Sequence, residues 1–190
     1  MDYDQKQQMV GGVFSNVAEQ YDVMNDAMSV GIHRYWKNYF IDQIGPIKPR
    51  QLLDSDDQPT GETTPLRCLD VAGGTGDISF KILHKAKADN PYANKLAVDI
   101  TVSDINADML EVGKKRAIEQ GIFNDLSFKV LNAEDLSELE SDSFDLYTIA
   151  FGIRNVTDRD KALREAYRVL RPGGRFMCLE FSEVIVPGFK

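Results

Sequence analysis

The chain is predicted to adopt an α/β fold with a mostly parallel sheet, on the basis of two observations. From Leu66 onward, strand-like apolar runs alternate with segments whose apolar residues recur at helical spacing. This alternation is typical of parallel strands joined by crossover helices that pack on both faces of the sheet. In addition, residues 69–77 combine the end of an apolar run with three glycines, which is typical of a nucleotide-binding turn between a strand and a helix.

The predicted elements follow one another in a regular order. Strands are expected at residues 66–72, 97–103, 126–131, 144–150 and 175–181, and helices at residues 77–88, 107–120 and 158–170. The last helix has the clearest pattern, since apolar residues repeat at three- and four-residue spacing from Ala162 to Leu170. Asp158 is expected to begin this helix, and Pro172-Gly173-Gly174 is expected to end it before the fifth strand.

Three parts of the chain differ in composition. Residues 1–50 are expected to form a helical N-terminal cap and substrate lid, because helical spacing continues on both sides of a loop at 21–31 that is rich in Asp, Asn, Ser and Met. Residues 51–65 are strongly polar and without periodicity, so a solvated polar loop is expected there. Residues 66–190 are expected to form the α/β core, and the three parts together are expected to form a single domain.

Charge and composition argue against several classes of partner. The net charge of −8 disfavours binding to nucleic acid or to an anionic membrane surface. No apolar run approaches the roughly 20 residues that cross a bilayer, so only peripheral membrane contact is expected. The acidic opening residues 1–6 fit neither a presequence nor a secretory signal, so no targeting segment is expected here. Cys68 and Cys178 have no metal-ligand spacing, so both are expected to be reduced and no metal site is predicted.

The glycine loop favours S-adenosylmethionine over a dinucleotide. Asp70 and Asp77 frame the loop, and carboxylates at a helix start would repel a pyrophosphate but suit a sulfonium and an ammonium. The dinucleotide spacing is also missing, because Ser79 stands where a third glycine or alanine is needed. The residues expected to contact the methyl donor here are Asp70, Gly73, Gly74, Thr75 and Gly76.

Three further strand ends carry polar residues that could complete the site. Ligands of open parallel sheets bind beyond the carboxyl ends of the strands. Asp104 is expected to accept the ribose hydroxyls while Ile105 flanks the adenine, with a helix cap at Asp104 as the alternative. Asn132 and Ala133 offer groups for the adenine edge, although such residues also cap helices. After the fourth strand, the apolar residues 149–151 are followed by a cation and an amide, Arg154 and Asn155, which could belong to the site. The alternative is that they lie in an ordinary surface loop.

Two long signatures resemble the ubiquinone and menaquinone C-methyltransferase family. The first is Tyr21-Asp22-Val23-Met24-Asn25-Asp26-Ala27-Met28-Ser29-Val30-Gly31-Ile32-His33-Arg34-Tyr35-Trp36. The second is Arg168-Val169-Leu170-Arg171-Pro172-Gly173-Gly174-Arg175-Phe176-Met177-Cys178-Leu179-Glu180-Phe181-Ser182. With the glycine loop and Phe151-Gly152-Ile153-Arg154-Asn155, the resemblance covers roughly residues 9–187. The acidic insertion before the first strand and the segment at 88–95 resemble the eukaryotic branch.

The resemblance implies a class I S-adenosylmethionine-dependent methyltransferase fold, Rossmann-like, with strand order 3-2-1-4-5. Thr75, Asp104, Asn132 and Ala133 are then expected to contact the donor. Ala150 stands where many members have a serine, which removes one polar contact. Members of the family continue beyond this chain, so the chain is expected to be C-terminally truncated, without the last two strands, and its fifth strand is expected to be a bare edge.

The resemblance also implies a reaction and a location. The expected reaction is methylation of a ring carbon of a 2-methoxy-6-polyprenyl-1,4-benzoquinol in ubiquinone biosynthesis. The expected location is the mitochondrial matrix, peripheral to the inner membrane, in a complex with other ubiquinone-biosynthesis proteins; a homodimer is left open. Two alternatives are a donor-binding scaffold module with little or no turnover and, from a different class, a nicotinamide oxidoreductase with a similar sheet.

Five residues are candidates for the chemistry. The acceptor carbon becomes nucleophilic when a neighbouring phenol loses its proton. His33 as the only base would face a pKa difference of roughly 3.5 units, which corresponds to about 5 kcal/mol. Arg154 keeps its proton but can stabilise the oxyanion or order a water, with Asn155 orienting the acceptor. Tyr21, Asp22 and His33 are the candidates for handling the proton, although His33 could instead be structural.

Overall fold

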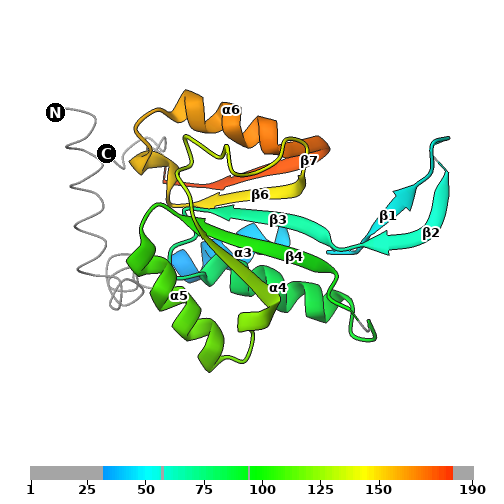
Figure 1. Ribbon diagram of the computed structural model, residues 1–190. Helices are drawn as coiled ribbons and strands as arrows, with labels where there is room; N and C mark the ends of the chain where they lie inside the picture. The colour runs from blue at the N-terminus through cyan, green and yellow to red at the C-terminus, as the bar shows by residue number, and fades with distance from the viewer. Residues whose placement is uncertain (1–31, 57, 94, 182–190) are drawn as a thin grey trace, which may run out of the picture.

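The computed structural model describes residues 32–56, 58–93 and 95–181, and within them a five-stranded parallel sheet forms the centre of the molecule (Figure 1). Its strand order is β5-β4-β3-β6-β7, which is the predicted order 3-2-1-4-5. All four neighbouring pairs are parallel. The strands are β3 (Leu66–Val71), β4 (Val98–Asp104), β5 (Leu126–Val130), β6 (Phe144–Ala150) and β7 (Leu170–Leu179). The predicted fold class is therefore confirmed.

The helices are α3 (Ile32–Asp42), α4 (Asp77–Asp89), α5 (Ala107–Glu119) and α6 (Arg159–Val169). Each of the three predicted core helices agrees with its observed counterpart to within one residue at either end. Two short 3-10 helices, η2 (Phe123–Asp125) and η3 (Ile153–Asn155), lie in the connections. In the described part of the chain, no helix combines the length and the hydrophobicity of a membrane span.

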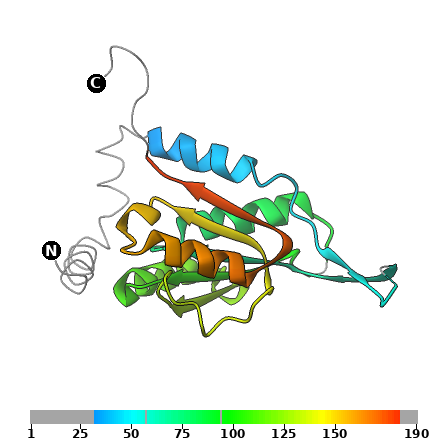
Figure 2. The same cartoon turned by 90° about the horizontal axis from the view of Figure 1, so that it is seen from above.

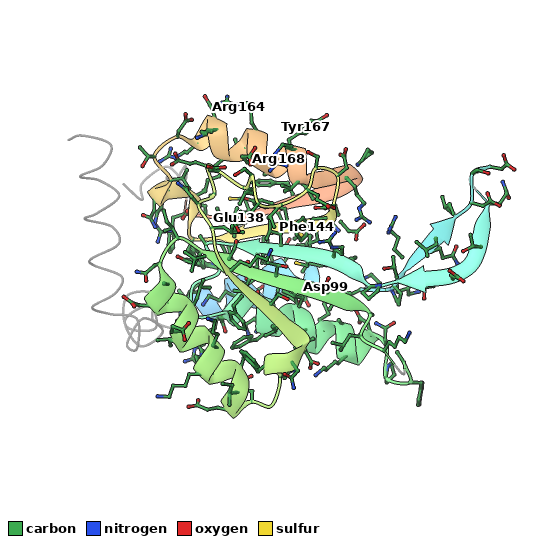
Figure 3. All side chains as sticks on the ribbon, viewed as in Figure 1. Asp99, Glu138, Phe144, Arg164, Tyr167 and Arg168 are labelled. Atoms are coloured by element: carbon green, nitrogen blue, oxygen red, sulfur yellow. The ribbon has the colours of Figure 1, made fainter. Side chains whose placement is uncertain are left out.

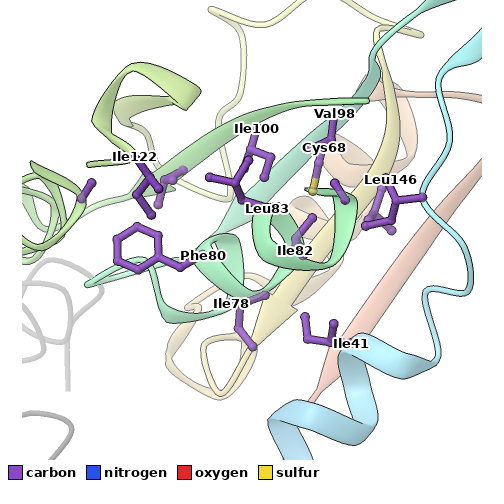
Figure 4. Packing of buried hydrophobic residues seen from close by; sticks show 14 of the residues in the cluster. Ile41, Cys68, Ile78, Phe80, Ile82, Leu83, Val98, Ile100, Ile122 and Leu146 are labelled. Carbon is purple, nitrogen blue, oxygen red and sulfur yellow. The ribbon is translucent and has the colours of Figure 1, made fainter. Parts of the chain in front are cut away.

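Two hydrophobic clusters cover the two faces of the sheet, because successive strand residues point to opposite faces. In β3, Cys68 belongs to the cluster beneath α3, α4 and α5, whereas Leu69 and Val71 belong to the cluster beneath α6. The first cluster is drawn in Figure 4, where α4 contributes Ile78, Phe80, Ile82 and Leu83. Figure 2 shows α3 lying beside β7 at one edge of the sheet.

Helix α6 is tied to the opposite face through Arg168. Its guanidinium donates to the carbonyl oxygens of Leu136 and Leu139, at 2.7 and 2.9 Å, and is paired with Glu165 at 2.8 Å. These bonds hold the long connection after β5 against the helix. Tyr167 lies on the outer side of α6 and is 85% exposed (Figure 3).

The segment expected as a polar loop at 51–65 is instead an antiparallel hairpin, so that prediction was wrong. Strands β1 (Arg50–Leu53) and β2 (Pro59–Thr64) pair with Arg50 opposite Thr64, and the hairpin projects away from the sheet (Figure 1). Polar interactions stabilise it rather than burial: Asp54 accepts backbone N–H groups of Asp56 and Gln58 at 2.9 Å. The expectation of a solvated segment holds, because nearly every described residue of the two strands is exposed.

The fifth strand begins earlier than predicted, at Leu170 instead of residue 175. Pro172-Gly173-Gly174 does not separate helix from strand but lies inside β7, where the register with β6 shifts between Phe144 and Leu146. Gly173 has a φ of 81°, which a residue other than glycine rarely adopts. The tripeptide therefore forms an irregularity within the strand. Among the described residues, β7 pairs only with β6.

Candidate functional site

A cavity opens at the carboxyl ends of β3, β4, β5 and β6. It is lined by the β3–α4 loop, by residues 104–106 at the end of β4, by residues 131–134 after β5, and by residues 150–152 and 155–157 at the end of β6 and beyond it. After β3 the chain adds β4 and β5 on one side of β3, and it then returns to add β6 and β7 on the other side. The cavity therefore lies at the point where the strand order reverses. Ligands of doubly wound sheets bind at this position.

The glycine loop forms a tight turn whose backbone faces the cavity. The N–H of Gly73 donates to the carbonyl of Ser103 at 2.9 Å, and the N–H of Gly76 donates to the carbonyl of Gly73 at 2.9 Å. A Cβ atom at Gly73 would lie 2.9 Å from Cγ1 of Val102 and 3.1 Å from Oδ2 of Asp70, so a residue other than glycine would have to displace these side chains. Gly74 and Gly76 have φ values of 54° and 85°. The glycines thus leave bare backbone at the cavity wall.

Asp70 lies beneath this loop and is almost completely buried. Its carboxylate accepts hydrogen bonds from the hydroxyls of Ser79 at 2.6 Å and Thr148 at 2.8 Å. Burial raises the pKa of Asp70 to about 6, although both hydroxyls favour the ionised form. Ser79, which breaks the dinucleotide spacing, therefore has a structural role in holding Asp70.

Asp104 fastens the glycine loop to the end of β4. Its Oδ2 accepts the N–H of Gly74 at 2.9 Å, and its Oδ1 accepts the N–H of Asn106 at 2.8 Å. Burial raises the pKa of Asp104, and the backbone N–H groups of Asn106 and Gly74 counteract that rise. The alternative of a helix cap is wrong, because Asn106 caps α5 by accepting from Asp108 and Met109. Each oxygen of Asp104 retains a lone pair that can accept a ligand hydroxyl.

The residues after β5 form a turn, so the alternative of a helix cap is wrong here as well. Oδ1 of Asn132 accepts the N–H of Glu134 at 3.0 Å. Glu134 is buried, and its carboxylate accepts the N–H groups of Thr157 and Asp158 at 2.9 and 3.1 Å. Glu134 thereby connects the wall after β5 to the wall after β6.

Asp77, the first residue of α4, is paired with a buried lysine. The Nζ of Lys37 lies 2.8 Å from Oδ2 of Asp77, and both residues line the cavity. Burial alone would raise the pKa of Asp77, but the ammonium of Lys37, together with the charges of Lys81 and Arg116, outweighs burial and the pKa lies below its usual value. The negative charge of Asp77 is therefore largely neutralised, and Asp77 would repel a pyrophosphate only weakly. The argument against a dinucleotide depends on Asp70 and Asp104 instead.

Arg154 lies beside the cavity and is held by Glu180, just after β7. The guanidinium of Arg154 forms an ion pair with Oε1 of Glu180, and the backbone N–H of Arg154 donates to Oε2 at 3.2 Å. The guanidinium also lies 5.1 Å from the centre of the Phe181 ring. The Phe181 ring contacts Phe151 and Trp36, with centroids 5.0 and 5.6 Å apart. An aromatic surface thus adjoins the cavity next to a positive charge.

The structure brings eight of the nine predicted donor-contacting residues to the cavity wall: Asp70, Gly73, Gly74, Thr75, Asp104, Ile105, Asn132 and Ala133. Gly76 shapes the turn without lining the cavity. Of the predicted catalytic residues, Asn155 lines the cavity, whereas Arg154 and the buried His33 do not. Tyr21 and Asp22 lie outside the described residues. No group of metal-ligating side chains is found within 32–56, 58–93 and 95–181.

Three charged residues at or beside the cavity were not singled out from the sequence as site residues: Lys37, Glu134 and Glu180. Glu134 and Glu180 follow strands, and that position is the signal that could have identified them. Lys37 has no such signal, because its approach depends on how α3 packs on α4.

Comparison with known proteins agrees with this geometry. The family model described as the ubiE/COQ5 methyltransferase family matches residues 2–190. A ubiquinone/menaquinone biosynthesis C-methyltransferase UbiE of Rhodopseudomonas palustris (strain TIE-1) is 53% identical over 185 residues, which cover 97% of this chain and 64% of that protein. The UbiE protein of Nitrobacter hamburgensis is 54% identical over 183 residues, covering 96% of this chain and 64% of that protein. The chain thus spans less than two thirds of the length of these relatives.

The fold also has relatives among solved structures. A protein of Methanococcus maripaludis described as an S-adenosyl-L-methionine-dependent methyltransferase superposes with a TM-score of 0.63 at 16% identity. The superposition covers 86% of this chain and 62% of that one. The sequence-based prediction of the methyltransferase family is confirmed. With its glycine loop, its strand-end acids and a match over residues 2–190, the chain belongs to the ubiE/COQ5 methyltransferase family.

Proposed function

We propose that the chain binds S-adenosylmethionine in this cavity and methylates a ring carbon of a polyprenylated benzoquinol in ubiquinone biosynthesis. The observation that carries the proposal is the convergence of the glycine loop, Asp104 and Asn132-Ala133 on one cavity in a member of this family. Relatives named as ubiquinone/menaquinone biosynthesis C-methyltransferases support the reaction class.

The residues at the cavity fit the donor. Gly73 and Gly74 line the cavity without side chains, so the backbone of the loop allows a nucleoside to approach closely. The lone pairs of Asp104 suit two neighbouring ribose hydroxyls. The carboxylates of Asp70, Asp104 and Glu134 line the cavity in addition to the Lys37–Asp77 ion pair, which suits a ligand with positive charge. Bound S-adenosylmethionine supplies a methyl group on a positively charged sulfur.

The acceptor is proposed to lie on the side of the cavity formed by Phe151 and Asn155. The rings of Phe151 and Phe181 form an apolar surface suited to an aromatic ring, and Asn155 at the cavity wall can orient one of its hydroxyls. Arg154 stays protonated, so it can stabilise an acceptor oxyanion by charge or order a water that removes the proton. Positioning and charge stabilisation are therefore the contributions that these residues make.

Within the family, the chain is proposed to belong to the eukaryotic branch. It is proposed to act in the mitochondrial matrix against the inner membrane, with other ubiquinone-biosynthesis proteins as partners. The hairpin formed by β1 and β2 supports this assignment, since it is the insertion before the first core strand that resembles that branch. Cell fractionation tests the location, and affinity purification of the tagged protein tests the partners. Recovery outside mitochondria, or without other enzymes of the pathway, would contradict them.

One incubation separates an enzyme from a donor-binding scaffold. The chain is mixed with methyl-labelled S-adenosylmethionine and a short-chain demethylated benzoquinol, and label in the quinol is measured. Transfer of label to a ring carbon is expected, whereas donor binding without transfer would identify a scaffold.

Replacement of Arg154 by Lys and by Ala, measured in single turnovers at saturating donor, then tests its role. An unchanged rate in both variants would remove Arg154 from the chemistry.

A further inference from the structure

Glu134 joins the two sides of the cavity that the proposed reaction brings together. It is 2% exposed and lines the cavity directly after Asn132 and Ala133, on the side expected to hold the adenine. Its Oε1 accepts the N–H groups of Thr157 and Asp158 on the other side, at 2.9 and 3.1 Å. A single carboxylate therefore bridges the donor side and the acceptor side of the cavity.

Capping of helix α6 explains only part of this contact. The helix is already capped by Asp158, whose side chain accepts the N–H of Lys161. In a capping box the side chain at position 161 would accept the N–H of the cap residue in return, but a lysine has no acceptor. Glu134 accepts this N–H from outside the helix, and it also accepts the N–H of Thr157, which lies before the helix. The contact therefore fixes the segment that leads into α6 as well as the start of the helix.

The segment between β6 and α6 is held at both ends by glutamates that follow other strands. At its beginning, Glu180 accepts the backbone N–H of Arg154 at 3.2 Å. At its end, Glu134 holds residues 157 and 158. Between these two points lies Asn155, which lines the cavity. The N–H of Asn155 donates to the carbonyl of Gly152 within the same segment, and such a local bond cannot set the distance of Asn155 from the donor side.

The connection that carries Glu134 is itself anchored. Asn132 accepts the backbone N–H of Glu134 at 3.0 Å. Two residues beyond Glu134, the N–H of Leu136 donates to Glu165 of α6 at 2.7 Å, and its carbonyl accepts from Arg168 at the same distance. Because the backbone is held on both sides of Glu134, its carboxylate is a fixed point from which the acceptor side can be positioned.

We propose that Glu134 is a positioning residue that sets the distance between the acceptor and the bound methyl donor. Methyl transfer breaks the sulfur–methyl bond as the bond to the ring carbon forms, so the three atoms must lie in line. A displacement of about 1 Å can cost about a hundredfold in rate. Glu134 acts through the backbone of residues 157 and 158, which carry Asn155 with them. This inference rests on the proposed function and adds a residue that aligns the two substrates.

Two substitutions separate the hydrogen bonds of Glu134 from its charge. E134Q loses the charge but keeps a carbonyl oxygen that can accept both N–H groups, whereas E134L loses the charge and the acceptor. Rates are measured in single turnovers at saturating donor with a short-chain demethylated benzoquinol. We expect the rate of E134L to be about tenfold or more below that of E134Q. The affinities of the two variants for S-adenosylhomocysteine, measured by calorimetry, should agree within about threefold.

Hydrogen exchange provides a readout that does not depend on turnover. In E134L the N–H groups of Thr157 and Asp158 are expected to lose protection, whereas E134Q should retain it. E134D keeps the charge but is shorter by one methylene group, so its carboxylate cannot reach both N–H groups from the same backbone position. E134D is expected to resemble E134L in rate and in exchange, and it serves as the test where E134L does not fold.

The matched control is E165L. Glu165 is also a carboxylate that accepts a backbone N–H of this connection, that of Leu136, but it does not line the cavity. Its substitution also removes the ion pair with Arg168. E165L is therefore expected to lower the stability while the rate of methyl transfer stays at the level of the wild type.

Equal rates in E134L and E134Q would overturn the role of Glu134, as would equal protection of the two N–H groups. A loss of donor affinity in E134L that matches the loss of rate would overturn it too, because Glu134 would then act on the donor. A loss of rate in E165L as large as that in E134L would assign the effect to general stability. Absence of methyl transfer by the wild-type chain would instead overturn the proposed function, and the positioning role with it.

Discussion

Gly152 lies against Ala72 across the ends of β6 and β3, so closely that a Cβ atom at Gly152 would be 2.5 Å from the Cβ of Ala72. Ala72 and Phe151, which precedes Gly152, both have positive φ values, 53° and 56°. Such backbone costs free energy in residues other than glycine and is concentrated at ligand-binding sites. The cavity floor is therefore built from two strained strand ends that fit together only because one of them carries a glycine.

Gly152→Ala is expected to destabilise the protein by about 1–3 kcal/mol, because the added methyl group displaces the end of β3 or β6. In a background of Ala72→Gly the same substitution should cost less than half as much, since the clashing atom is gone. Chemical denaturation of the four proteins in a double-mutant cycle measures this coupling. Additive effects of the two substitutions would contradict the proposed contact.

Asp70 should make stability fall as pH rises from about 4 to about 6. Its pKa is raised from 3.8 to about 6, so the folded state holds a proton that the unfolded state has already lost in this window. The shift of about two units corresponds to roughly 3 kcal/mol of lost stability above pH 6. In Asp70→Asn this loss should be absent, so the free energies of unfolding of variant and wild type should diverge between pH 4 and pH 7. Parallel curves over that range would contradict the prediction.

Thr148→Val provides a second measure of the same group. The Thr148 hydroxyl donates to Oδ1 of Asp70 and favours its charged form. Its removal should raise the pKa of Asp70 further and move the destabilised window to higher pH, as seen in unfolding curves recorded at closely spaced pH values.

The core of the fold could be predicted because its signals are local. Apolar runs and helical spacing mark β3 to β6 and α4 to α6, and parallel strands bring their carboxyl ends to one edge, which makes Asp104 and Asn132 neighbours. The hairpin of β1 and β2 could not be predicted in this way, because it buries no apolar face. Its side-chain hydrogen bonds are to the backbone: Asp54 accepts from the N–H of Asp56, and Thr60 donates to the carbonyl of Leu52. Pro172-Gly173-Gly174 has the composition of a helix stop, yet a register shift accommodates it inside β7.

The site could be predicted where one residue acts alone at a strand end. It could not be predicted where two distant residues act together, as in Lys37 with Asp77 or Arg154 with Glu180. These pairs depend on how α3 packs on α4 and how β7 lies beside β6, and no local pattern records either arrangement. The same reason explains why Asp77 was expected to repel a pyrophosphate and why its pairing with Lys37 was not expected.

Asp104→Ala should weaken donor binding by about ten- to a hundredfold, since charge-assisted hydrogen bonds contribute roughly 1.5–3 kcal/mol each. Titration calorimetry with S-adenosylhomocysteine measures the effect, and circular dichroism checks that the variant is folded. Asp99→Ala is the matched control, because Asp99 lies near the start of the same strand, away from the cavity (Figure 3). Unchanged affinity in folded Asp104→Ala would exclude Asp104 from the ribose site.

Glu180→Gln should reduce the rate of methyl transfer without reducing stability or donor affinity. The Arg154 side chain is 40% exposed, so its ion pair with Glu180 contributes less than about 1 kcal/mol to the free energy of unfolding. Glu180 nevertheless fixes the guanidinium and the backbone of η3, and a displaced Arg154 should lower kcat by about tenfold or more. Glu165→Gln removes a comparable pair, with Arg168 on α6, away from the cavity, and should leave kcat unchanged. Equal effects of the two substitutions on kcat would show that Glu180 acts through general stability and not through the position of Arg154.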